Sequence, residues 1–215
     1  MTDDSIDVRE MLGIHDALRK EFASLPLMEK GVADGDAERA GIVGDHILFM
    51  CDLLQSHHEG EDATVWPILQ ERAPEHAALI ESMVAQHHAL EAMLLTVREQ
   101  VAVWQADPHV NNRAALHTSL IRLERLLLDH LSHEETDTLP VIAATFSPAE
   151  FAAVGEHARG SLPPDKLMIA MGMILDDTTS DIAELMLSGM PPEARAGFDQ
   201  FGRPAYAAYR ERLLG

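Results

Sequence analysis

The sequence contains a single cysteine and few cationic side chains. Cys51 stands alone, which excludes a disulfide framework and a cluster of thiolate metal ligands. Lysine and arginine together number 16, against 36 aspartates and glutamates, and the formal net charge is −20. Nucleic acids and anionic membrane surfaces both attract cationic side chains, so neither is expected as a partner.

Long hydrophobic runs are also missing. A membrane-spanning helix needs roughly 20 consecutive apolar residues. The longest run, from Leu167 to Leu175, is about half that length and is followed by two aspartates. The N-terminus, from Met1 to Asp7, is acidic and therefore unlike a signal or transit peptide. We therefore expect a cytoplasmic protein.

The composition favours helices over strands. Aromatic residues make up only 5% of the chain, strand-type alternation is hard to find, and alanine, leucine and methionine are plentiful. Apolar residues recur at spacings of three and four in residues 11–25, 47–65, 83–101 and 116–134. Short loops between long helices favour antiparallel neighbours, so the predicted fold is all-α, with an up-down-up-down four-helix bundle.

Two stretches far apart in the chain share one pattern: a histidine, then a glutamate four residues later, then a proline ten residues after the histidine. The stretches are His57, Glu61 and Pro67, and His130, Glu134 and Pro140. Positions i and i+4 share a helix face, so each stretch presents an imidazole and a carboxylate together. Such nitrogen and oxygen ligands suit a transition metal such as iron or manganese. The proline should end or kink each helix.

A further histidine precedes each stretch at nearly the same distance, so the whole unit is repeated. His15 precedes the first stretch and His87 precedes the second. These histidines interrupt apolar stripes, and a buried cluster of polar groups is costly unless something satisfies it. A metal ion bound between the helices would do so.

Helix register separates neighbouring histidines. His57 continues the apolar stripe of its helix, whereas His58 lies roughly 100° further round. His87 is preferred to His88 for the same reason. We therefore expect His57 to bind metal and His58 not to, while His133 remains a reserve candidate.

The end of the chain reads as a helical extension. Ser147 and Glu150 have the spacing of a capping box, and residues 165–187 read as one further helix. Its methionines either fill gaps in a core or form an adaptable binding surface. The predicted organisation is a bundle over residues 1–146 and an extension over residues 147–215 that packs on it.

Together these motifs resemble the hemerythrin-like, or HHE cation-binding, domains over about residues 5 to 145. The resemblance implies a di-iron centre in the bundle, with two iron ions joined by an oxo or hydroxo bridge, and manganese is an alternative metal. It also implies terminal imidazole ligands and two bridging carboxylates. These would be His15, His57, His87 and His130 as terminal ligands, and Glu61 and Glu134 as bridges.

One position departs from the pattern of oxygen-carrying relatives. They have a fifth histidine one turn before the ligand of the third helix, and here that position is Met83, whose thioether is a poor iron ligand. Glu59 is the first candidate to replace it, with Glu91, His88 and His133 as alternatives. An open iron position would favour binding of O2, NO or peroxide, and their chemistry, over simple reversible O2 carriage.

The predicted function is a non-haem di-iron protein that binds O2, NO or peroxide for sensing, storage or scavenging. The alternative is a di-iron enzyme that decomposes hydrogen peroxide or reduces NO. A ferritin-like protein is disfavoured because its Glu-x2-His pattern does not occur in the sequence, and a metal-free adaptor leaves the histidines unexplained. The expected partner is therefore a small ligand, and the oligomeric state stays open, with a homodimer among the alternatives.

Overall fold

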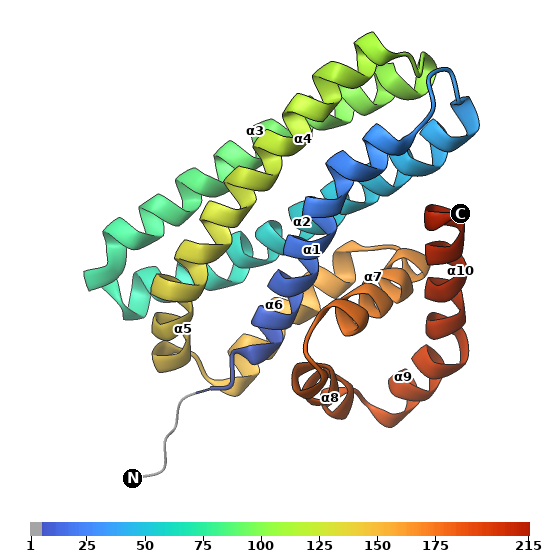
Figure 1. Ribbon diagram of the computed structural model, residues 1–215. Helices are drawn as coiled ribbons and strands as arrows, with labels where there is room; N and C mark the ends of the chain where they lie inside the picture. Colours follow the sequence, from blue (N-terminus) through green and yellow to red (C-terminus); the bar gives the residue numbers. More distant parts are fainter. Residues whose placement is uncertain (1–5) are drawn as a thin grey trace.

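The computed structural model describes residues 6–215, and that part of the chain is built from helices without any β-strand (Figure 1). The predicted all-helical class is confirmed. Residues 1–5, which carry most of the acidic N-terminus and the start of the predicted first domain, lie outside the described residues. Among residues 6–215, no helix combines the length and the apolar character that a bilayer span requires.

Four long helices come first in the chain (Figure 1). They are α1 (Arg9–Gly31), α2 (Ala37–Arg72), α3 (Ala77–Ala106) and α4 (Val110–His133). Each packs against two others, because α1 contacts α2 and α4, and α3 also contacts α2 and α4. Asp36 caps α2 by accepting a hydrogen bond from the backbone N–H of Arg39, and the short 3-10 turn η1 (Pro74–His76) leads into α3.

The two prolines of the repeated pattern behave differently. Pro67 lies inside α2, which continues to Arg72, so of the two predicted outcomes, an end or a kink of the helix, the first does not occur. Trp66 and Leu69 are buried on either side of it, and their packing offsets the hydrogen bond that a proline removes from a helix. Pro140 instead lies in the first turn of a new helix, where its missing N–H costs little.

A π-helical turn separates α4 from that new helix. The turn is η2 (Glu134–Thr138), and the helix that follows is α5 (Leu139–Thr145). A π-turn changes the rotation of the chain locally, and such turns are frequent at functional sites. Here the first residue of the turn is Glu134, one of the two predicted bridging carboxylates.

Shorter helices make up the rest of the chain. They are α6 (Pro148–Ser161), α7 (Pro164–Asp177), α8 (Ser180–Gly189), α9 (Pro192–Gly197), the π-turn η3 (Phe198–Gly202) and α10 (Arg203–Leu214). The capping box of Ser147 and Glu150 is present. The single helix predicted over residues 165–187 is wrong, because the chain is extended at Thr178 and Thr179. Thr179 donates a side-chain hydrogen bond to Asp181, a local contact that competes with helix continuation.

These shorter helices cover one side of the long ones (Figure 1). α6 and α10 contact α2, while α7 and α8 contact α1. Met173 of α7 is completely buried, and the methionines at positions 168, 171, 186 and 190 are half-buried. These side chains therefore contribute to packing, while the division of the chain at residue 146 stays a prediction.

A buried polar cluster joins this extension to α1 and α2. Glu21 and His46 are 2% and 1% exposed, with the His46 Nε2 3.3 Å from a carboxylate oxygen of Glu21. From α10, Arg210 donates to the other oxygen of Glu21 at 2.9 Å, and the Tyr209 hydroxyl lies 2.6 Å from the His46 Nδ1. Burial alone would raise the pKa of Glu21, but the hydrogen bond and charge of His46 and the charge of Arg210 hold that pKa below its usual range.

Replacing Arg210 with methionine is expected to lower the free energy of unfolding by about 1–3 kcal/mol at about pH 7. A depressed carboxyl pKa contributes stability that is present above the ordinary value of 4.5 and is lost as the pH falls through the folded-state pKa. The difference between wild type and variant should therefore narrow below pH 4.5 in urea unfolding.

The matched control is Arg212→Met, because Arg212 is an exposed residue of the same helix. That substitution should change the free energy of unfolding by less than about 0.5 kcal/mol. A destabilisation by Arg210→Met that is equally large at both pH values would show that lost packing, rather than the Glu21 ion pair, is responsible.

Candidate metal centre

Seven buried histidine and glutamate side chains meet in the interior of the four long helices. They form two groups: His15, His57, Glu61 and Glu134 in the first, and His58, His87 and His130 in the second. Within each group, one nitrogen or oxygen atom of every residue lies within 4.8 Å of the others. None of these side chains is more than 6% exposed. The helices therefore gather enough donors in one place to hold metal ions.

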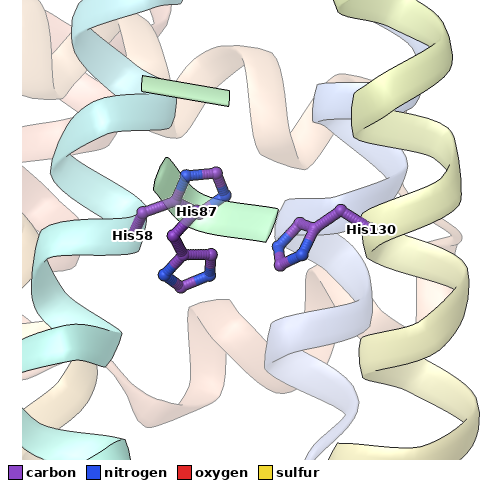
Figure 2. A group of neighbouring side chains, drawn as sticks. All are labelled: His58, His87 and His130. Atoms are coloured by element: carbon purple, nitrogen blue, oxygen red, sulfur yellow. The ribbon is translucent and has the colours of Figure 1, made fainter. Parts of the chain in front are cut away.

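Each of the four long helices contributes to the centre. α1 carries His15, α3 carries His87 and α4 carries His130 within stripes of buried leucine and other apolar residues. α2 contributes the adjacent pair at 57 and 58 and, one turn later, Glu61. Figure 2 shows how the three rings of the second group turn toward one another from α2, α3 and α4.

Glu61 lies between the two groups. Its Oε1 is 3.3 Å from the Nε2 of His57, and its Oε2 is 3.4 Å from the Nε2 of His87. The two oxygens of one carboxylate thus face imidazoles of different groups. This is the arrangement that a carboxylate bridge between two metal ions requires.

Glu134 also reaches both groups. Its Oε2 lies 3.3 Å from the Nε2 of His15 and 3.6 Å from the Nε2 of His130. Glu134 is the first residue of the π-turn and directly follows α4, so its side chain points to the same interior as that of His130. Glu134 therefore also lies beside both groups, but it approaches both imidazoles with the same oxygen, whereas Glu61 uses one oxygen for each.

The donor atoms of the centre lack normal hydrogen bonds. The Nε2 atoms of all five histidines and both oxygens of Glu61 and Glu134 are buried without a hydrogen-bond partner among the described residues. A buried polar group left unpaired costs about 1–3 kcal/mol. Metal cations would satisfy these atoms together, and imidazole with carboxylate is a donor set that suits iron.

Two carboxylates outside the centre fix the orientation of two rings. Glu135 lies 2.9 Å from the Nδ1 of His15 and also pairs with Arg19 at 2.7 Å. Asp62 lies 2.7 Å from the Nδ1 of His87 and accepts a hydrogen bond from the Trp66 indole at 2.6 Å. Such contacts favour a proton on Nδ1, so that Nε2 is left free to face the interior.

Burial sets the protonation of three of the imidazoles. It lowers the pKa of His57 to about 3 and that of His130 to about 4, and it lowers the pKa of His58 as well. The charges of neighbouring histidines act in the same direction. These rings are therefore neutral near pH 7, which is the form that binds a metal.

Neighbouring carboxylates raise the pKa of the other two imidazoles more than burial lowers it. Burial would lower the pKa of His15 and His87, but Glu134 and Glu135 raise the first to about 10, and Asp62 and Glu61 raise the second to about 9. Burial, together with the charge of Glu134, raises the pKa of Glu61 to about 8. Without metal, the centre therefore holds protons that an incoming cation must displace.

The chain matches the family described as the Hemerythrin HHE cation binding domain over residues 7–142. It belongs to this family. No curated protein and no solved structure matches the chain. Domains of this family bind metal cations, typically iron, and both buried groups lie within the matched residues and could hold a metal.

The hemerythrin HHE fold of this chain brings together the six side chains to which the sequence resemblance assigned ligand roles, and it adds His58. His58, which is expected not to bind metal, is buried within the second group: its ring is 5% exposed and stacks on that of His87 at 4.2 Å between centroids. The expectation itself concerns metal binding and stays a prediction. α2 packs on both α1 and α3, so two of its positions 100° apart face the interior. His57 lies beside His15, and His58 lies beside His87.

Glu59, predicted as the replacement ligand, lies in neither group. It is exposed, and its carboxylate accepts a hydrogen bond from Gln55 at 2.7 Å. Position 59 is about 200° round the helix from position 57, which turns it away from the centre. The alternatives Glu91, His88 and His133 are exposed as well.

Met83 leaves no gap in this hemerythrin HHE domain. It is fully buried in an apolar cluster that includes Trp66 and Leu139. The two groups together contain five histidines, of which two lie on α2 and one on α3. The adjacent pair His57 and His58 was the sequence signal for the second histidine on α2, because a helix with neighbours on two sides can bury two consecutive residues.

Proposed function

We propose that α1 to α4 form the up-down-up-down bundle of a di-iron hemerythrin-like protein, with one iron ion in each group. Glu61 and Glu134 would bridge the two ions, and manganese is the second candidate metal. The observation that supports this most directly is Glu61, whose two oxygens lie 3.3 Å and 3.4 Å from imidazole nitrogens of different groups.

The two proposed iron positions differ in their protein donors. The second position has three imidazoles in addition to the bridging carboxylates, whereas the first has only those of His15 and His57. Two histidines with a carboxylate form the type of site that leaves positions of non-haem iron open to small ligands. We therefore propose that O2, NO or peroxide binds on the side of His15 and His57.

The presence of five imidazoles also changes which of the candidate functions is preferred. The argument against reversible O2 carriage depended on a missing fifth histidine, and His58 supplies that ring. Reversible binding of O2, for storage or sensing, becomes the first candidate, while NO and peroxide remain small ligands of the same site. The bound iron would supply the redox chemistry, and the protein contributes the buried imidazole and carboxylate donors and the ring orientation fixed by Glu135 and Asp62.

The test is the metal content and absorption spectrum of protein prepared without oxygen. We expect about two iron ions per chain and new near-ultraviolet bands on exposure to air that fade when oxygen is removed. Bands that appear but never reverse would contradict O2 storage, and samples mixed with NO or peroxide would then identify the ligand. A protein that takes up no iron or manganese would overturn the proposal as a whole.

A further inference from the structure

A small cavity opens between α2 and α3 beside the second group of histidines. It has a volume of about 80 Å³, and the buried rings of His58 and His87 form part of its wall. Toward the outside, its lining includes Glu59, Asp62 and Glu91. These three carboxylates are exposed, whereas His58 and His87 are only 5% and 3% exposed. The cavity therefore connects the protein surface with the metal centre.

The inner end of the cavity offers a free donor. The Nε2 of His58 is buried and lacks a hydrogen-bond partner among the described residues, and the same is true of the Nε2 of His87. A water molecule occupies roughly 30 Å³ in the liquid, so the cavity has room for a cation with part of its hydration shell. A cation in the cavity could exchange its waters for these imidazoles one at a time.

The outer end is negatively charged. Arg98 of α3 donates to Asp52 at 2.6 Å and to Gln55 at 3.1 Å, and Asp52 also accepts a hydrogen bond from Lys166 at 2.8 Å. Gln55 in turn donates to Glu59 at 2.7 Å, which holds that carboxylate at the rim. Clefts lined by one sign of charge concentrate ions of the opposite sign and raise their association rates.

We propose that this opening, the α2–α3 mouth formed by Glu59, Asp62, Glu91 and His88, takes up divalent metal cations and passes them inward to His58 and His87. The mouth holds a cation only transiently, and it is distinct from the centre that retains the metal. Glu59 thus serves metal loading rather than permanent ligation. This inference rests on the proposed function, because it assumes that the centre is filled by cations from solution.

The probe is Co²⁺, whose visible absorption changes when nitrogen and oxygen ligands replace water. Metal-free protein is mixed with Co²⁺ in a stopped-flow instrument, and the rate of the colour change is compared between two double variants. Glu59→Gln with Glu91→Gln removes two of the three carboxylates of the mouth and leaves Asp62. Glu71→Gln with Glu99→Gln removes the same charge from exposed positions of the same two helices, away from the cavity.

We expect Co²⁺ uptake to be roughly tenfold slower in the mouth variant than in the control variant at low ionic strength. Because exposed charges are screened by salt, the difference should shrink as salt is added. The final amount of bound Co²⁺ should be the same in both variants, since neither changes a residue of the two buried groups.

Equal rates of Co²⁺ uptake in the two double variants would overturn the proposal that metal enters through the mouth. A lower final Co²⁺ content in the mouth variant would also overturn it, because Glu59 or Glu91 would then be a permanent ligand. Neither result depends on iron redox chemistry. A protein that loads Co²⁺ through the mouth but binds no O2, NO or peroxide would contradict only the proposed function.

Discussion

Replacing Glu61 with glutamine is expected to empty both metal positions while the helices stay folded. The side chain is 1% exposed and lies between His57 and His87, one oxygen toward each. A neutral amide has a single oxygen and an NH2 group, so it cannot bridge two cations or balance their charge. Metal content should fall from about two ions per chain to well below one.

The effect of Glu61→Gln on thermal stability should depend on metal. Stabilisation by a bound metal grows with its free concentration and amounts to about 2.7 kcal/mol at a hundred times the Kd. The variant should lack that increment. Without metal, burial and the charge of Glu134 raise the pKa of Glu61 to about 8, so the native carboxyl is already largely neutral near pH 7. Metal-free variant and metal-free wild type should therefore melt at similar temperatures.

Glu59→Gln is the matched control for this substitution. It makes the same chemical change two residues earlier on α2, at an exposed position outside both groups. This variant should bind as much metal as the wild type and melt at the same temperature when loaded. Retention of both metals by Glu61→Gln, together with their loss in Glu59→Gln, would contradict the bridging role of Glu61 and make Glu59 a metal ligand.

The repeated pattern of the sequence locates most of the centre. The histidine and glutamate four residues apart share a helix face wherever the helix is regular, so His57 with Glu61 and His130 with Glu134 were predictable pairs. The π-turn that begins at Glu134 was not predictable, because no residue type marks such a turn. The π-turn does not separate His130 from Glu134, because it begins only after His130, which lies in the regular helix α4.

Predicting buried residues from a single apolar stripe of a helix fails where the helix packs against neighbours on two sides. Such a stripe assigns one buried face to each helix, but α2 contacts α1 along one side and α3 along another. His58 is buried for that reason, although its position is 100° away from that of His57. The break at Thr178 and Thr179 was missed for a different reason: the apolar residues on either side have helical spacing, but residues 176–181 between them are all polar, and the hydrogen bond from Thr179 to Asp181 competes with helix continuation.

Replacing His58 with alanine is expected to remove one metal ion and leave the other. The second group then keeps only two imidazoles, while the first group keeps all of its residues. The loss of a group that merely orients a ligand lowers metal affinity by about 10- to 100-fold, so the loss of a ligand itself should lower it by more. Metal content near one ion per chain, with altered near-ultraviolet bands, is the expected result. His88→Ala, at the exposed neighbour of His87, is the control and should retain both ions.

Met83 allows a direct test of where the fifth imidazole has to come from. It lies one helical turn before His87 on α3, is completely buried, and stands at the position where the resemblance to oxygen-carrying hemerythrins predicts a fifth histidine. If the centre needs a fifth ring but not a particular helix to supply it, the double variant His58→Ala with Met83→His should regain the second metal ion. Met83→His alone should not raise the metal content, because five rings are already present. Unchanged metal content and spectrum in His58→Ala would instead make His58 a buried neighbour of the centre, and recovery in the double variant could not then be observed.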